Sequence, residues 1–87
     1  MYTRDSPCKA IVQGVFSGKH GLPYCVAQAE GIEGSITFSL EPTVWAENEY
    51  PEQGEVVLLE SLRNKRAGWR AKKGRFWKPS DEQSEIR

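Results

Sequence analysis

The sequence predicts a small all-β domain. The chain has 87 residues, and its 8 Gly and 5 Pro recur about every ten residues, so no long helical pattern develops. Short runs rich in Val, Ile and aromatic residues lie between these turn formers, a spacing typical of a barrel or sandwich. The run 34–40 (GSITFSL) alternates apolar residues with Ser and Thr, which predicts a strand with one apolar face and one hydroxyl face.

The first half of the chain holds three predicted strands. The first strand covers residues 8–17 and ends at a turn with the letters SGKHG. The second covers residues 22–29, and its Pro23 has no N–H for a ladder, so Pro23 should lie at the start of the strand or on an edge. A second Gly-containing turn leads to the third strand, residues 34–40.

The second half contains a long loop and two more strands. Residues 41–54 include two Pro and four Glu, a composition that predicts a loop. A loop of this length is unusual in a small domain, and such loops are generally functional or cross from one part of the sheet to another. The fourth strand is expected at 55–62, a turn at 63–66 and the fifth strand at 67–77.

The order of short and long connections predicts the type of fold. Five short strands with tight connections, except for the long link between the third and fourth, favour a five-stranded OB-type barrel. An SH3-like barrel, which also has five short strands, is the alternative. Residues 8–78 should form this single domain, with an N-terminal extension (1–7) before it and a polar tail (79–87) after it.

Several segments resemble the cold-shock family and the related S1 domains. The letters VQGVFSGKHGLPYCVAQAEG resemble the first hairpin of a cold-shock domain, and GSITFSL resembles its third strand. PEQGEVVLLESL resembles the entry into the fourth strand, and NKRAGWRAKKGRF the closing strand. The resemblance implies an OB-type barrel that binds nucleic acid through stacking aromatics. Leu22 and Pro23 stand where the family has an aromatic residue and a glycine, which leaves Tyr24 and Phe38 in the second and third strands.

The charges of the chain are sorted along its length. The 12 basic and 12 acidic residues give no net charge, but residues 1–60 carry three cations and nine acids, and residues 61–87 carry nine cations and three acids. The segment 63–78 holds eight Lys or Arg, no acid and three large aromatics. Basic residues interleaved with aromatics suit a phosphate backbone with unstacked bases.

The sequence therefore predicts a small nucleic-acid-binding protein that takes single-stranded RNA or DNA with little sequence specificity. In this hypothesis cations follow the phosphates and aromatics stack on bases. If the fifth strand is extended, Arg70 and Lys72 share one face, and Trp69 and Ala71 share the other. The predicted contact residues are Phe16, Lys19, His20, Tyr24, Arg63, Lys65, Arg66, Trp69, Arg70, Lys72, Lys73, Arg75, Trp77 and Lys78.

A protein-interaction module is the alternative function. Its interface would combine the acidic loop 41–55 with the basic strand 63–78, and Trp and Arg are enriched at interface hot spots. The loop could meet the basic strand of the same molecule, of a second copy in a homodimer, or of another protein. A third reading is a solvated edge strand that its cations protect from aggregation. The candidate partner-binding residues are Trp45, Glu47, Glu49 and Tyr50.

The residue inventory argues against an enzyme. His20 is the single histidine, and no nucleophile motif or phosphate-binding Gly motif is present, so we expect no catalytic residue, metal site or cofactor. Cys8 and Cys25 lie outside any CxxC pair, and we expect both to be reduced. The N-terminus has no apolar signal core, and no apolar run approaches the roughly 20 residues of a membrane span, which predicts a cytoplasmic protein with no membrane partner.

Overall fold

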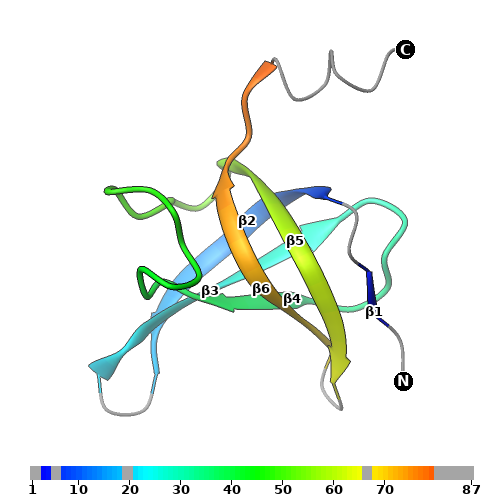
Figure 1. Ribbon diagram of the computed structural model, residues 1–87, viewed down its shortest axis with the longest axis horizontal. Helices are drawn as coiled ribbons and strands as arrows, with labels where there is room; N and C mark the ends of the chain where they lie inside the picture. The colour runs from blue at the N-terminus through cyan, green and yellow to red at the C-terminus, as the bar shows by residue number, and fades with distance from the viewer. Residues whose placement is uncertain (1–2, 5–6, 19–20, 66–67, 80–87) are drawn as a thin grey trace.

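The computed structural model describes residues 3–4, 7–18, 21–65 and 68–79, and its strands close into a barrel (Figure 1). Strands β2 to β6 form the five-stranded barrel, and the short β1 pairs with β5 outside it. The all-β prediction is confirmed, and the closed five-stranded barrel is consistent with a small OB-type fold. No described segment is a helix with the length and apolar character needed to cross a membrane. The strands are β1 (Thr3–Arg4), β2 (Cys8–Ser17), β3 (Pro23–Ala29), β4 (Ile36–Ser39), β5 (Val56–Lys65) and β6 (Gly68–Phe76).

One parallel pair of strands closes the barrel. Strands β2, β3 and β4 form an antiparallel meander, and β4 then pairs in parallel with β6 through Ile36↔Trp69 and Thr37↔Arg70. Strand β6 pairs antiparallel with β5, and β5 pairs antiparallel with β2. Parallel neighbours cannot be joined by a tight turn. The chain therefore passes through the long loop and β5 before β6 reaches β4, which accounts for the length of that loop.

Strand β5 extends further than the sequence predicts. The expected turn at 63–66 is wrong for its first three residues, because Arg63, Asn64 and Lys65 continue the ladder opposite Arg70, Trp69 and Gly68. Three polar residues after an apolar run have the composition of a turn, but their pairing with β6 keeps them extended. The β5–β6 hairpin therefore carries its cations on two paired strands rather than on one strand and a turn.

Inward side chains from the strands and from the long loop fill the barrel. Ile36, Phe38 and Leu40 are buried, as the alternation along this strand predicts. The indole of Trp45 stacks on Phe38 with ring centroids 5.7 Å apart, and it meets the Phe76 ring edge-on at 5.0 Å. Trp45 is only 2% exposed. A residue of the loop therefore completes the core.

The alternation of buried and exposed side chains along β5 is interrupted at Ser61. The backbone of Ser61 is left-handed, with φ 57°. The next inward side chain after Leu59 is therefore Leu62, three residues later, instead of the residue two positions on that strict alternation would give. On the facing strand, burial likewise passes from Ala71 to Gly74. The two consecutive lysines between those buried positions are both exposed. This local break in alternation concentrates positive charge on the outer surface.

Gly68, the first residue of β6, lies against the backbone of Ser35, just before β4. Its φ is 133°, and a Cβ at this position would lie 2.7 Å from the carbonyl oxygen of Ser35. The N–H of Trp69 donates to the same oxygen at 2.9 Å. A side chain at Gly68 would both strain the backbone and push apart the parallel pair that closes the barrel.

We predict that Gly68→Ala destabilises the protein more than Gly31→Ala does. Both glycines have positive φ, but a Cβ at Gly31 meets nothing within 4 Å. The backbone strain alone should cost about 1–2 kcal/mol at Gly31, and the clash at Gly68 should add about 1–3 kcal/mol. Urea unfolding of the two variants gives both values, and equal losses would show that the contact with Ser35 does not constrain closure.

We also predict that Cys25 makes stability fall at alkaline pH. Cys25 is fully buried on β3, and burial raises the pKa of its thiol from 9.0 to about 11. Above pH 9 the unfolded chain loses this proton while the folded protein retains it, so the unfolded state is favoured as the pH approaches 11. The free energy of unfolding should drop by about 2 kcal/mol over this range through Cys25 alone.

The variant Cys25→Ala isolates that contribution, because other groups that ionise in the same range remain in it. Its unfolding free energy, measured from pH 8 to pH 11, should fall less steeply than that of the parent protein. Val57→Ala, which opens a gap in the core but keeps the Cys25 thiol, is the control and should keep the parent slope. Identical slopes for all three proteins would contradict the assignment.

Candidate nucleic-acid interface

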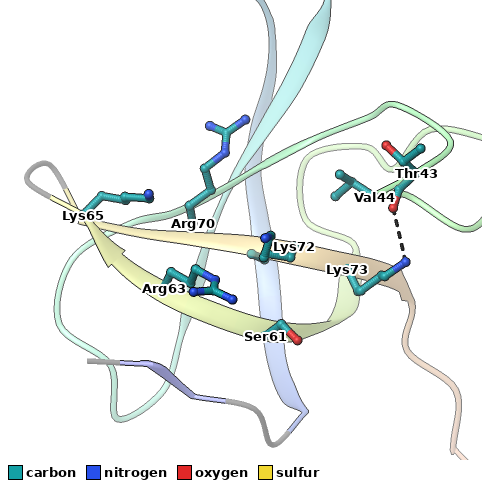
Figure 2. Close-up of a pocket in the computed structure, with 9 residues that line it drawn as sticks. Thr43, Val44, Ser61, Arg63, Lys65, Arg70, Lys72 and Lys73 are labelled. Carbon is teal, nitrogen blue, oxygen red and sulfur yellow. Dashed lines mark hydrogen bonds between the residues drawn. The ribbon is translucent and has the colours of Figure 1, made fainter. Parts of the chain in front are cut away.

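A basic groove runs along the β5–β6 hairpin, from beside its turn toward the long loop (Figure 2). Its volume is about 490 Å³. Both strands of the hairpin supply cations to it, and the long loop supplies one wall. In Figure 2, Lys73 turns away from the other cations toward the loop, where its Nζ donates to the carbonyl of Thr43 at 3.4 Å. The lining residues are Thr43, Val44, Ser61, Arg63, Lys65, Arg70, Ala71, Lys72 and Lys73.

In the part of the chain that the structure describes, four cations of the basic groove form no ion pair with a carboxylate. Arg63 lies directly opposite Arg70 in the ladder between β5 and β6, and like charges at such positions repel one another. Within residues 3–4, 7–18, 21–65 and 68–79, no carboxylate lies within 4.0 Å of the charged groups of Arg63, Lys65, Arg70 or Lys72. A polyanion placed in the groove would relieve this repulsion.

Arg70 also lines a second hollow, which reaches toward the β2–β3 hairpin. This bridging hollow has a volume of about 400 Å³. Tyr24 lines it together with Arg70, and Glu41 contributes a carboxylate that accepts a hydrogen bond from the Ser39 hydroxyl at 2.8 Å. Arg70 therefore joins the basic groove to a surface that carries an aromatic ring. The lining residues are Gly18, Leu22, Pro23, Tyr24, Ser39, Glu41 and Arg70.

Phe16 and Tyr24 form an aromatic pair beside this hollow. They lie opposite each other in the β2–β3 ladder, with ring centroids 5.7 Å apart and ring planes inclined by 34°. Phe16 is 48% exposed. Val26, two residues after Tyr24 on β3, pairs with Thr37 of β4. Thr37 in turn pairs with Arg70 of β6. Side chains two apart share a face, so the aromatic pair and Arg70 lie on the same outer face of the barrel.

Four other predicted contact residues lie away from the basic groove. Trp69 is partly buried and packs against the core on the face opposite to Arg70, as the alternation along the fifth strand predicts. Trp77 lies under the ammonium of Lys9, which is 4.1 Å from the ring centroid. The guanidinium of Arg75 donates to the carbonyl of Phe76 at 3.2 Å, and Lys78 is exposed beyond the end of β6.

The acidic loop is tied to the barrel rather than presented as a separate surface. Trp45, proposed as a partner-binding anchor, is buried, and its Nε1 donates to the carbonyl of Glu49 at 2.7 Å. The Glu47 carboxylate accepts the Phe76 N–H at 3.3 Å. Tyr50 is exposed at 54%, and the Glu49 side chain is exposed as well. An interface anchored by Trp45 is therefore ruled out, because its indole already belongs to the core.

Some of the site lies beyond what the sequence could indicate. The predicted contacts Lys19, His20 and Arg66 fall outside the described residues. The groove wall formed by Thr43 and Val44 was not predicted, because a loop residue shows its partner only once the chain is folded. Ser61 was missed as well, because the sequence shows Glu60 and Ser61 interrupting the apolar run of the strand but not which of the two has the left-handed backbone.

The packing of Trp45 against Gly74 suggests a direct test of its role in the core. Gly74 pairs with Trp45 in a parallel bridge, and a Cβ at Gly74 would lie 3.3 Å from the indole. We predict that Trp45→Ala costs about 3–5 kcal/mol in the free energy of unfolding, because it removes a buried indole. Tyr50→Ala, in the same loop, should change stability by less than about 0.5 kcal/mol. Urea denaturation measures both, and a small loss for Trp45→Ala would contradict its placement in the core.

No protein-family model, curated protein or solved structure matches this chain. Within the described residues no group of three or more His, Cys, Asp or Glu side chains is arranged to hold a metal ion. The functional assignment therefore depends on the basic groove, the bridging hollow and the aromatic pair.

Proposed function

We propose that this protein binds single-stranded nucleic acid along the outer face that joins the basic groove to the aromatic pair. The phosphates lie in the basic groove, where Arg63, Arg70 and Lys72 neutralise them. The strand then passes over Arg70 and the bridging hollow to Tyr24 and Phe16, where bases stack. The observation that carries this proposal is Arg70, which lines both hollows and so connects the two kinds of contact.

The exposed aromatic pair favours a single strand over a duplex. Base stacking on an aromatic ring contributes about 1–3 kcal/mol per base and needs a base whose face is free. In a duplex those faces are stacked within the helix. The partly exposed Phe16 ring and its neighbour Tyr24 offer such a surface. Both phosphate neutralisation and stacking tolerate many sequences, so most contacts are independent of the base.

The resemblance to the cold-shock and S1 families supports the same function. Those domains are OB-type barrels, and the closed five-stranded barrel of this chain is consistent with that fold. We infer that the chain is a cold-shock-like or S1-like domain whose aromatic surface is reduced to Phe16 and Tyr24. The added basic groove on the β5–β6 hairpin compensates for the smaller stacking surface.

We predict that the double variant Arg70→Gln, Lys72→Gln weakens binding of a fluorescein-labelled oligothymidylate of about ten nucleotides by at least tenfold at low salt. Each lost phosphate contact should also reduce the slope of log K against log salt by about 0.7, so the double variant should lose about 1.4. Fluorescence anisotropy at several salt concentrations measures both quantities. An unchanged slope would show that these cations do not contact phosphate.

Lys9→Gln is the control for charge, because it removes one positive charge away from the groove, where the double variant removes two within it. Lys9 lies over Trp77 and does not line the basic groove. This variant should keep the parent affinity to within about twofold and the parent salt slope. If Lys9→Gln weakened binding as much as the groove variant does, only the net charge of the protein would matter, and the proposed path would be wrong.

A further inference from the structure

A third hollow lies on the far side of Phe16, between the end of β2 and the long loop. Its volume is about 520 Å³, which is ample for one nucleobase. We call it the loop hollow. Phe16 lines it and also contacts Tyr24, so the loop hollow continues the path proposed for the nucleic acid. The lining residues are Gln13, Gly14, Val15, Phe16, Tyr50, Pro51, Glu52 and Gln53.

The walls of the loop hollow are apolar and aromatic. Phe16 comes from β2 and Tyr50 from the loop, and about half of each side chain is exposed. Val15, which is 39% exposed, adds apolar surface to the same hollow. Exposed aromatics on two separate segments, facing one hollow, are an arrangement that accepts a flat aromatic ligand.

The loop is held in place, so the hollow is largely formed before a ligand arrives. On one side of Tyr50, the carbonyl of Glu49 accepts the Trp45 indole N–H, and on the other side Pro51 is buried. The N–H of Gly54 donates to the carbonyl of Val12 at 2.8 Å, which ties the loop to β2. Anchors on both sides of Tyr50 reduce the entropy lost on binding.

The polar groups of the loop hollow are a carboxylate and two amides. The Glu52 backbone N–H donates to the Glu55 carboxylate at 2.7 Å, which fixes the backbone that carries the Glu52 side chain. The Gln13 amide donates to the carbonyl of Ile11 at 3.3 Å, and its own oxygen faces no described donor. Among the described residues, no cation lies within 4.0 Å of the Glu52 carboxylate. That carboxylate is therefore available as a pure hydrogen-bond acceptor.

We propose that the loop hollow binds a guanine base of the nucleic acid and that Glu52 selects it. This inference rests on the proposed function. Guanine presents two adjacent donors, N1–H and N2–H, on its Watson–Crick edge, which match the two oxygens of one carboxylate. Adenine, cytosine and thymine or uracil each place an acceptor beside their donor, and an acceptor would face the Glu52 carboxylate unfavourably. Phe16 and Tyr50 contact the faces of this base. At the other positions of the nucleic-acid strand any base is accepted.

The test compares strands that differ in one base. An oligothymidylate of about ten nucleotides is titrated against the same strand with a central guanine, adenine or hypoxanthine, by anisotropy at low salt. The guanine strand should bind about tenfold more tightly than oligothymidylate, since one good bidentate contact discriminates by about that factor or more. The affinity for the hypoxanthine strand, whose base lacks the N2 amino group, should lie between the affinities for the guanine strand and for oligothymidylate. The adenine strand should bind no more tightly than oligothymidylate.

Variants then assign the preference to Glu52. Glu52→Gln should bring the affinity of the guanine strand, relative to that of oligothymidylate for the same variant, down to about one, because an amide presents one donor and one acceptor. Glu33→Gln, an exposed carboxylate in the turn before β4, removes the same charge and should keep the guanine preference. Equal binding of all four strands, or a preference that survives Glu52→Gln, overturns the guanine site while leaving the proposed function intact. Failure of every strand to bind overturns both.

Discussion

The parallel pairing of β4 with β6 is the constraint on which the rest of the structure depends. It involves only two residue pairs, and it brings the backbone at Gly68 against the Ser35 carbonyl. This pairing sets β6 between β4 and β5. The outer face of β6 is then flanked by the polar face of β4 on one side and by the cations of β5 on the other. The basic groove and the aromatic pair share a surface because the barrel closes in this order.

The long loop serves the core and the surface at the same time. Its Trp45 fills the barrel and packs against Gly74, and its backbone forms one wall of the basic groove through Thr43. A few residues later Tyr50 and Glu52 border the loop hollow. Because a buried indole anchors the segment between them, the two surface sites have fixed positions relative to the barrel. The acidic composition of the loop gave no sign of this division of roles.

The general fold and the cations of the site could be predicted because they depend on local patterns. Turn formers, alternation and the long link indicated an all-β barrel, and the charge sorting indicated the basic strand. Other features depend on partners that are distant in the sequence. The extension of β5 through Lys65 needs its partners on β6, and the left-handed Ser61 is recognised only from the buried positions on each side of it. The burial of Trp45 likewise follows from packing.

The opposed guanidinium groups of Arg63 and Arg70 have a consequence for the free protein. Arg63 and Arg70 are paired in the ladder, and repulsion between their charges would weaken the hairpin near its turn when the groove holds only water and small ions. Added salt screens that repulsion and firms the empty hairpin, yet the same salt competes with any polyanion for the groove. Ionic strength would therefore act in opposite directions on folding and on the proposed association, so the medium in which the empty barrel is most stable is also one in which a polyanion would bind least tightly.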